Sequence, residues 1–177
     1  YVKREVPLTA QQKKYYQQLH DQMLVHADGE EISAANAAIM MNKLMQISCG
    51  AVYSDDKETI EFDISNRYKV LREVIDESSQ KVLIFVPFRH TIQILVQRLR
   101  KDGITAEFIS GDVSASKRTE IFKRFQTQDD PRVLVIQPQA AAHGVTLTAA
   151  NTVVWWGPTS SLETYAQANA RVHRSGQ

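Results

Sequence analysis

The spacing of apolar and polar positions changes near residue 64 of this 177-residue chain. The first part, residues 1–64, is polar, and its apolar residues recur at the helical period. Thr9 and Gln12 fit a capping box that opens a helix, and Gly29 marks its end, which predicts a helix up to residue 28. We therefore expect a small, mainly helical N-terminal subdomain.

Two further elements complete this subdomain. A second apolar stripe predicts a helix over 33–48, with Met41 on its apolar face and Gly50 just past its end. Residues 51–63 then predict a short hairpin around the polar turn SDDKET.

From residue 65 onward, strand patterns alternate with amphipathic helices. The run KVLIFV at 81–86 is continuously apolar, as expected of a strand buried on both faces. The order β-α-β-α-β-loop-β-α predicts a parallel sheet with helices on both faces. Ligands of such sheets bind at the carboxyl ends of the strands. The other predicted strands are 104–109, 132–137 and 152–156, and the loops at the carboxyl ends are 87–90, 110–114, 137–147 and 157–161.

Composition narrows the possible classes. The formal net charge of +1 argues against a uniformly basic surface but leaves room for a local basic face. A single cysteine, Cys49, excludes a disulfide within the chain, favours a reducing compartment, and is interpreted as a core residue. The histidines are too scattered to predict a metal site, and we expect no membrane span and no secretory signal. Both ends suggest a piece of a longer protein.

The sequence QANARVHRSGQ at 167–177 holds the strongest candidate chemistry. Arg171 and Arg174 are three residues apart, so a helix would place both guanidinium groups on one face. Two such groups suit a phosphate cluster, because each is permanently charged and can bind bidentately. A solvated basic helix end is an equally good interpretation of the residues alone.

The loop QPQAAAHGVTLTAAN at 137–151 follows a buried strand and is rich in small residues. Such a backbone can approach a phosphate closely, although tight packing against the next helix is the simpler interpretation. No GxxxxGK[ST] phosphate loop is present in the sequence. The paired acidic residues fall in predicted turns, where no strand end would hold Mg²⁺.

Taken in order, these segments resemble the C-terminal RecA-like lobe of Swi/Snf-type superfamily-two helicases over nearly the whole chain. VPLTAQQKKYYQQL resembles the entry into that lobe, and LMQISCGAVY and SNRYKVLREVID resemble the helices that follow. KVLIFVPFRHTIQIL resembles motif IV, FISGDVSASKRTEIFKRFQ the segment after it, and PQAAAHGVTLTAANTVVWW motif V. QANARVHRSGQ resembles motif VI, Q-A-x-x-R-x-H-R-x-G-Q.

Departures from the family pattern favour a divergent, bacterial or phage-like member. Ala141 and Ala142 stand where two glycines are usual, and Thr146 stands where asparagine is usual. The strand after motif V ends in Trp155-Trp156, where chromatin remodellers have an acidic segment.

The resemblance implies a RecA-like fold that completes an ATP site between two lobes. It assigns Arg171 and Arg174 as arginine fingers, Gln167 as their orienting partner, and Gly144 to the nucleotide side. The phosphate loop and the residues that hold Mg²⁺ would belong to the protein's own N-terminal RecA-like lobe, so this chain is expected to hold no metal and to be inactive in ATP hydrolysis alone.

The resemblance also implies binding to double-stranded DNA through contacts with the phosphates of one strand. We expect a monomer, in the cytoplasm of a bacterial or phage-infected cell, or in the nucleus of a eukaryote. The residues expected to contact DNA are Phe88, Arg89, His90, Ser110, Gly111, Gln139, Ala140 and Gly144.

Two alternatives remain open from the sequence. One is the second lobe of another superfamily-two motor, such as a restriction-type translocase or an RNA helicase. The other is a non-catalytic protein-interaction module with a relic RecA-like fold, in which residues 1–64 form the partner surface.

Overall fold

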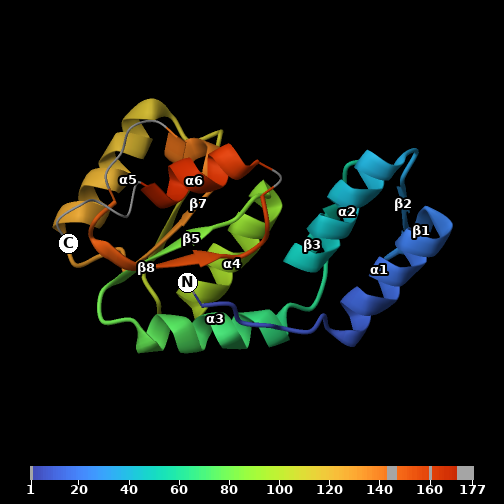
Figure 1. The fold of residues 1–177 in the computed structure, drawn as a ribbon, viewed down its shortest axis with the longest axis horizontal. Coiled ribbons are helices and arrows are strands. Elements are labelled where there is room, and N and C mark those ends of the chain that lie inside the picture. Colours follow the sequence, from blue (N-terminus) through green and yellow to red (C-terminus); the bar gives the residue numbers. More distant parts are fainter. Residues whose placement is uncertain (1, 143–146, 160, 171–177) are drawn as a thin grey trace. The chain divides into compact units, whose positions relative to one another are not determined.

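A computed structural model describes residues 2–142, 147–159 and 161–170 of the chain. The chain forms two compact units, residues 1–76 and 77–177 (Figure 1). The sequence places a domain boundary at 64/65, one helix earlier, and that domain division stays a prediction.

The first unit combines helices with two antiparallel hairpins, one more hairpin than the sequence predicted. Its elements are α1 (Ala10–Gln22), β1 (Leu24–Ala27), β2 (Glu30–Ser33), α2 (Ala37–Cys49), β3 (Ala51–Tyr53), β4 (Thr59–Glu61) and most of α3 (Ser65–Glu77).

Helix α1 begins as predicted and ends earlier than predicted. The Thr9 hydroxyl accepts from the Gln12 amide at 3.3 Å, and the Gln12 side chain accepts from the Thr9 amide at 3.2 Å, which confirms the capping box. Met23 takes a left-handed conformation with φ of 56° and ends the helix. The predicted extension to residue 28 is wrong, because Asp28-Gly29 forms the turn of the β1–β2 hairpin with φ values of 51° and 81°.

Helix α2 and the β3–β4 hairpin follow the prediction with two corrections. The helix starts after Asn36, whose side chain accepts from the Ile39 amide at 2.9 Å, so the predicted start at Ser33 is wrong. Met41 is 60% exposed and does not belong to the buried face. Gly50 ends the helix with φ of 116°, as predicted.

A buried cluster built from α1, α2 and the two hairpins fills the first unit. Cys49 is also fully buried, as predicted, and its burial raises the pKa of the thiol above the usual value. The buried members of the cluster are Leu19, Val25, Ala27, Ile32, Ala34, Leu44, Ile47, Val52, Ile60 and Phe62.

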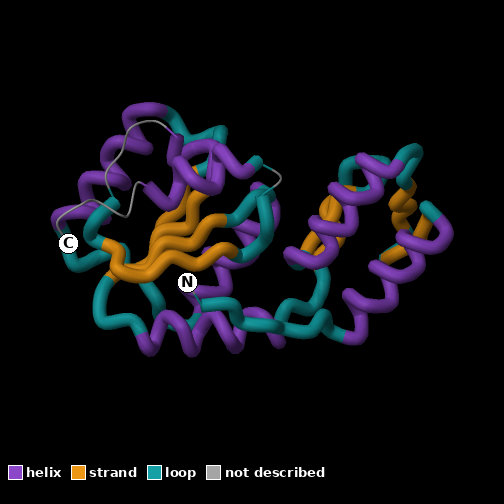
Figure 2. Tube along the Cα trace, in the orientation of Figure 1, coloured by secondary structure: helices purple, strands orange, loops and turns teal. Residues whose placement is uncertain are grey.

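The second unit is a four-stranded parallel sheet in the order β6-β7-β5-β8 (Figure 2). The predicted parallel sheet is therefore confirmed. Its elements are β5 (Lys81–Phe85), α4 (Arg89–Lys101), β6 (Ala106–Ile109), α5 (Ala115–Thr127), β7 (Val133–Ile136), the 3₁₀ turn η1 (Pro138–Ala142), β8 (Ala150–Trp155) and α6 (Leu162–Ala170).

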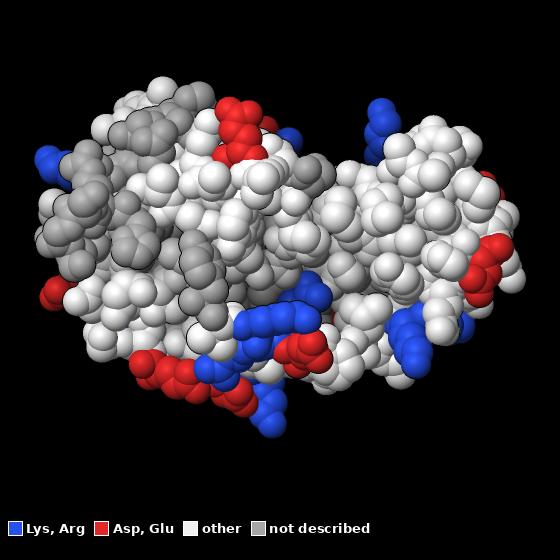
Figure 3. Space-filling view, in the orientation of Figure 1, with Lys and Arg blue, Asp and Glu red and all other residues white. Residues whose placement is uncertain are grey.

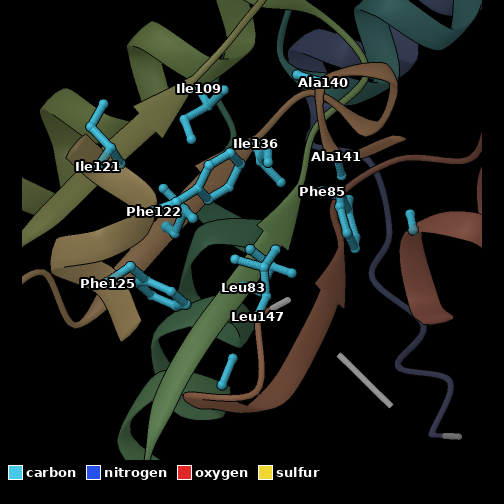
Figure 4. Close-up of a cluster of buried hydrophobic side chains, with 13 residues drawn as sticks. Leu83, Phe85, Ile109, Ile121, Phe122, Phe125, Ile136, Ala140, Ala141 and Leu147 are labelled. Carbon is cyan, nitrogen blue, oxygen red and sulfur yellow. The ribbon is translucent and has the colours of Figure 1, made fainter. Parts of the chain in front are cut away.

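Helices cover both faces of this sheet, with α5 and α6 on one side and α4 on the other (Figure 1). Alternate side chains of β5 and β7 point into the α5–α6 side and form one buried cluster with those helices (Figure 4). Burying each large apolar side chain here contributes about 1.5–3 kcal/mol. The buried members are Leu83, Phe85, Ile109, Ile121, Phe122, Phe125, Leu134, Ile136, Ala140, Ala141, Leu147, Ala150 and Ala168.

Candidate nucleic-acid interface and arginine segment

Three neighbouring strands end at the same edge of the sheet. Phe85 of β5 and Ile109 of β6 both lie in register with Ile136 of β7. The loops that follow these strands therefore start side by side. They contain most of the residues that the sequence predicts to contact DNA.

Phe88 lies in the loop after β5, whereas Arg89 and His90 are the first two residues of α4, so the predicted loop over 87–90 ends before Arg89. Phe88 is half-buried and its ring stacks on that of His90, with centroids 5.8 Å apart and planes inclined by 15°. The His90 side chain is itself buried, at 4% exposure. Arg89 is exposed and forms an ion pair with Asp112 in the loop after β6. The exposed cation at the start of α4 thus has an acidic neighbour.

The loop after β6 contains Ser110 and Gly111. Ser110 is buried, and its carbonyl accepts from the Val113 amide at 3.2 Å, which closes a turn. Arg118 of α5 donates to the Val113 carbonyl at 3.3 Å and holds that turn from the helix side. The Gly111 amide donates to the side chain of Gln137 at 3.3 Å.

Gln137 is a site residue that the sequence did not reveal. It follows β7 directly, and its side chain reaches both neighbouring loops, because it also donates to the Pro87 carbonyl at 3.4 Å. The sequence pointed to Gln139 in the same segment, which is exposed. The sequence feature that could have indicated Gln137 is its place, since it is a polar residue directly after a central buried strand.

The small residues after β7 serve packing. Ala140 and Ala141 are 6% and 0% exposed and belong to the core cluster that includes Ala168 of α6. The packing interpretation therefore holds for these two side chains. A backbone contact of Ala140 with DNA stays a prediction, and Gly144 lies outside the described residues.

The segment returning from this loop is held by α5. The Gln126 side chain accepts from the Ala149 amide at 2.9 Å and donates to the Thr148 hydroxyl at 3.3 Å. Leu147 is fully buried beside them.

Helix α6 leads to the arginine segment. Ser161 caps the helix by accepting from the Thr164 amide at 3.1 Å. Gln167 is exposed, and its amide donates to Glu163 one turn earlier at 2.9 Å. Arg171 and Arg174 lie outside the described residues, so their roles stay predictions.

Trp155, at the end of β8, anchors α6. Its indole N–H donates to Asn169 at 3.2 Å, and its ring lies 4.8 Å from the Tyr165 ring and 4.6 Å from the Phe85 ring. Ala168 is 1% exposed in the core. The last described turn before Arg171 is therefore tied to two strands of the sheet.

The charges on the surface indicate that an anion such as DNA would be attracted by single basic side chains and not by a uniformly basic face. On the face shown in Figure 3, Lys and Arg side chains lie among Asp and Glu side chains, without an extended area of one sign in the described part. Within the described ranges, no three His, Cys, Asp or Glu side chains gather into a group that could hold a metal ion. No described helix is long and apolar enough to cross a membrane.

The parallel sheet with helices on both faces defines the class, a RecA-like α/β domain. Within this class, the family described as "Helicase conserved C-terminal domain" matches residues 66–176, and the chain belongs to that family. The Swi/Snf-type resemblance is confirmed by the family match together with the relatives, and the structural neighbours share the fold.

Two relatives and one solved structure illustrate the similarity. An uncharacterized ATP-dependent helicase of Mycoplasma genitalium is 30% identical over 94% of this chain and 16% of its own length. The CHD3-type chromatin-remodeling factor PICKLE of Arabidopsis thaliana is 26% identical over 97% of this chain and 13% of its own. The Sulfolobus solfataricus SWI2/SNF2 ATPase C-terminal domain has a TM-score of 0.58 and 21% identity, covering 82% of this chain and 66% of that one. The chain thus spans less than a fifth of these two relatives.

Proposed function

We propose that this chain is the C-terminal motor lobe of an ATP-dependent DNA translocase. In this role Arg171 and Arg174 act as arginine fingers, Gln167 orients them, and the loops at the carboxyl edge of the sheet contact DNA phosphates. The ATP and its Mg²⁺ are bound mainly by an N-terminal RecA-like lobe.

The observation that carries the proposal is the anchoring of α6. Trp155 and the buried Ala168 fix the end of this helix against the sheet, directly before the segment with Arg171 and Arg174. Catalytic guanidinium groups need such support, because they act by being in place before charge develops on the transferred phosphoryl group. An arginine finger contributes about 10³-fold or more to turnover.

The arginines of the segment 171–177 are residue types that bind the phosphates of a nucleotide. The described residues offer no group of side chains suited to Mg²⁺. Guanidinium and amide groups donate to phosphate oxygens, whereas Mg²⁺ needs carboxylates, which do not cluster in the described part of the chain. ATP supplies the phosphoryl group when it is bound between the lobes. Arg171 and Arg174 would bind its γ-phosphate side.

The DNA side of the proposal rests on the loops after β5, β6 and β7. Arg89 at the start of α4 and Gln139 in η1 are exposed on either side of this edge, and the loop after β6 contains the buried Ser110. This arrangement suits a track for the backbone of one DNA strand. Contacts of this kind position the protein without reading sequence. The names of the relatives, ATP-dependent helicase and chromatin-remodeling factor, agree with such a role.

A comparison of polynucleotides tests this function. We expect ATP turnover by the intact protein to be stimulated more by duplex DNA than by single-stranded DNA or RNA. A preference for RNA would favour an RNA helicase, and no ATP turnover would favour the relic interaction module. The chain of residues 1–177 alone is expected to hydrolyse no ATP, and turnover by this piece would refute the division of the site.

A further inference from the structure

Gln137 occupies a fixed place between the loop that leads into Arg89 of α4 and the loop that contains Ser110. It follows β7, which lies between β6 and β5 in the sheet. The backbone N–H of Gln137 donates to the Ile109 carbonyl at 2.9 Å, and the backbone carbonyl of Gln137 accepts from the Ala140 N–H at 2.8 Å. The backbone of Gln137 is therefore held on both sides before its side chain makes any contact.

The side chain then connects the neighbouring loops. Its Nε2 donates to the carbonyl of Pro87, the residue before Phe88, at 3.4 Å. Its Oε1 accepts from the amide of Gly111, the residue after Ser110, at 3.3 Å. The carboxamide has a donor nitrogen and an acceptor oxygen, so one side chain can bind the Pro87 carbonyl and the Gly111 N–H at the same time.

We propose that Gln137 is a positioning residue that sets the spacing of the two DNA-contacting loops. This inference rests on the proposed function, because it takes these loops as the DNA track. Arg89 and Asp112 link the same loops by an ion pair, but both side chains are about half exposed and solvent weakens their attraction. The half-buried amide bridge of Gln137 is the link that persists when a phosphate displaces Asp112 from Arg89.

The bridge also changes the role expected of Gly111. The sequence resemblance suggested that its amide meets a phosphate, but this N–H donates to Gln137. DNA contact from this edge would therefore fall on the exposed side chains of Arg89 and Gln139, because Ser110 is buried and Gly111 serves to join the loops.

The chemistry of the bridge defines the variants that test it. Gln137→Met keeps the length of the side chain and removes both hydrogen bonds. Gln128→Met is the matched control, because Gln128 is exposed at the end of α5, before β7 begins. The readouts are the dissociation constant for a 30-base-pair duplex and the DNA concentration that half-saturates ATPase stimulation in the intact protein.

For Gln137→Met we expect both DNA constants to rise about fivefold, the scale of one or two lost hydrogen bonds. The turnover number at saturating DNA should stay within about twofold, because the bridge does not touch the arginine segment. Gln128→Met should match the parent protein. A fall in turnover at saturating DNA with unchanged DNA constants would overturn the inference.

A double-mutant cycle with Arg89→Ala separates positioning from general destabilisation. If Gln137 acts through the loop that precedes Arg89, the fivefold effect shrinks to about twofold or less in the Arg89→Ala background. If the effects of Gln137→Met and Arg89→Ala on the DNA constants are fully additive, Gln137 does not position Arg89. That result would not affect the proposal that these loops contact DNA. If Arg89→Ala itself leaves DNA affinity unchanged, the proposed DNA track fails.

Gln137→Asn covers the case in which Gln137→Met does not fold. It keeps the carboxamide and shortens its reach by one methylene, so it should fold and still weaken DNA binding. DNA constants equal to those of the parent protein would overturn the inference.

Discussion

The indole N–H of Trp155 donates to the side chain of Asn169 at 3.2 Å and ties the last strand to the helix that precedes Arg171. Trp155→Phe removes this hydrogen bond and keeps the ring near Phe85 and Tyr165. We expect the free energy of unfolding to fall by about 1 kcal/mol. ATP turnover by the intact protein should fall about tenfold, because small displacements of catalytic groups are costly.

Tyr165→Phe is the control for this change, since it keeps the aromatic ring that faces Trp155 and removes only the hydroxyl. Turnover and stability should match the parent protein. If Trp155→Phe lowers stability and leaves turnover unchanged, Trp155 supports the fold but does not position the arginine segment.

Asp112 is expected to compete with DNA for Arg89. Asp112→Asn removes the carboxylate that faces the guanidinium and should tighten duplex binding about threefold at low salt, with a smaller effect at high salt. Glu120→Gln removes the same charge from α5, where its carboxylate pairs with Lys117 and Arg124. Anisotropy titrations should show a smaller change for this control. Equal effects of both variants would indicate a general charge effect and not a local competition.

Gly50 has a packing requirement in addition to its left-handed backbone. A Cβ at this position would overlap Cγ2 of Ile64, whereas a Cβ at Gly103 would meet nothing within 4 Å. Both glycines have positive φ, at 116° and 79°. Denaturant titrations should give a loss of about 1 kcal/mol for Gly103→Ala and about 3 kcal/mol for Gly50→Ala. Equal losses would show that Ile64 moves aside freely.

Asp55 links β2, α2 and the β3–β4 turn. Burial raises the pKa of this carboxyl, but hydrogen bonds from Lys43 and Ser33 outweigh burial and lower the pKa from 3.8 to about 2. A lowered folded pKa gives stability that is fully present above about pH 4 and is lost as the pH falls toward 2.

Asp55→Asn should therefore lower the free energy of unfolding by about 1 kcal/mol at pH 6. The difference from the parent protein should shrink between pH 4 and pH 2 in urea titrations, and Asp56→Asn in the same turn serves as the control. A difference that does not change with pH would contradict this role of Asp55.

Much of the second unit could be predicted because its strands are buried on both faces. The continuous apolar runs at 81–86 and 132–137 place β5 and β7 within a residue or two of their bounds. Parallel pairing then follows from the intervening helices, and with it the edge at which the loops gather.

The errors in the first unit have a local cause. Leu24 continues the apolar spacing of α1, and a glycine such as Gly29 is also typical of a helix end. Asp28-Gly29 between alternating residues is instead a strong hairpin signal, since both residues adopt positive φ readily.

The role of Gln137 could not be predicted in the same way. Its two side-chain partners, Pro87 and Gly111, are distant in sequence and become neighbours only when the strand order β6-β7-β5 is known. The resemblance to motif V points to Gln139 in the same segment. A motif match identifies positions in the chain and does not show which side chains are in contact.

The most direct test of the motor-lobe proposal is DNA-stimulated ATP turnover by the intact protein with Arg174→Ala. We expect turnover to fall about 10³-fold while the dissociation constant for duplex DNA stays within about twofold. Arg174→Lys should recover little, because an ammonium group lacks the planar fork of guanidinium, and Arg4→Ala on an exposed residue of the first unit should behave as the parent protein. Turnover by Arg174→Ala close to that of the parent protein would contradict the proposal that this chain supplies the arginine finger.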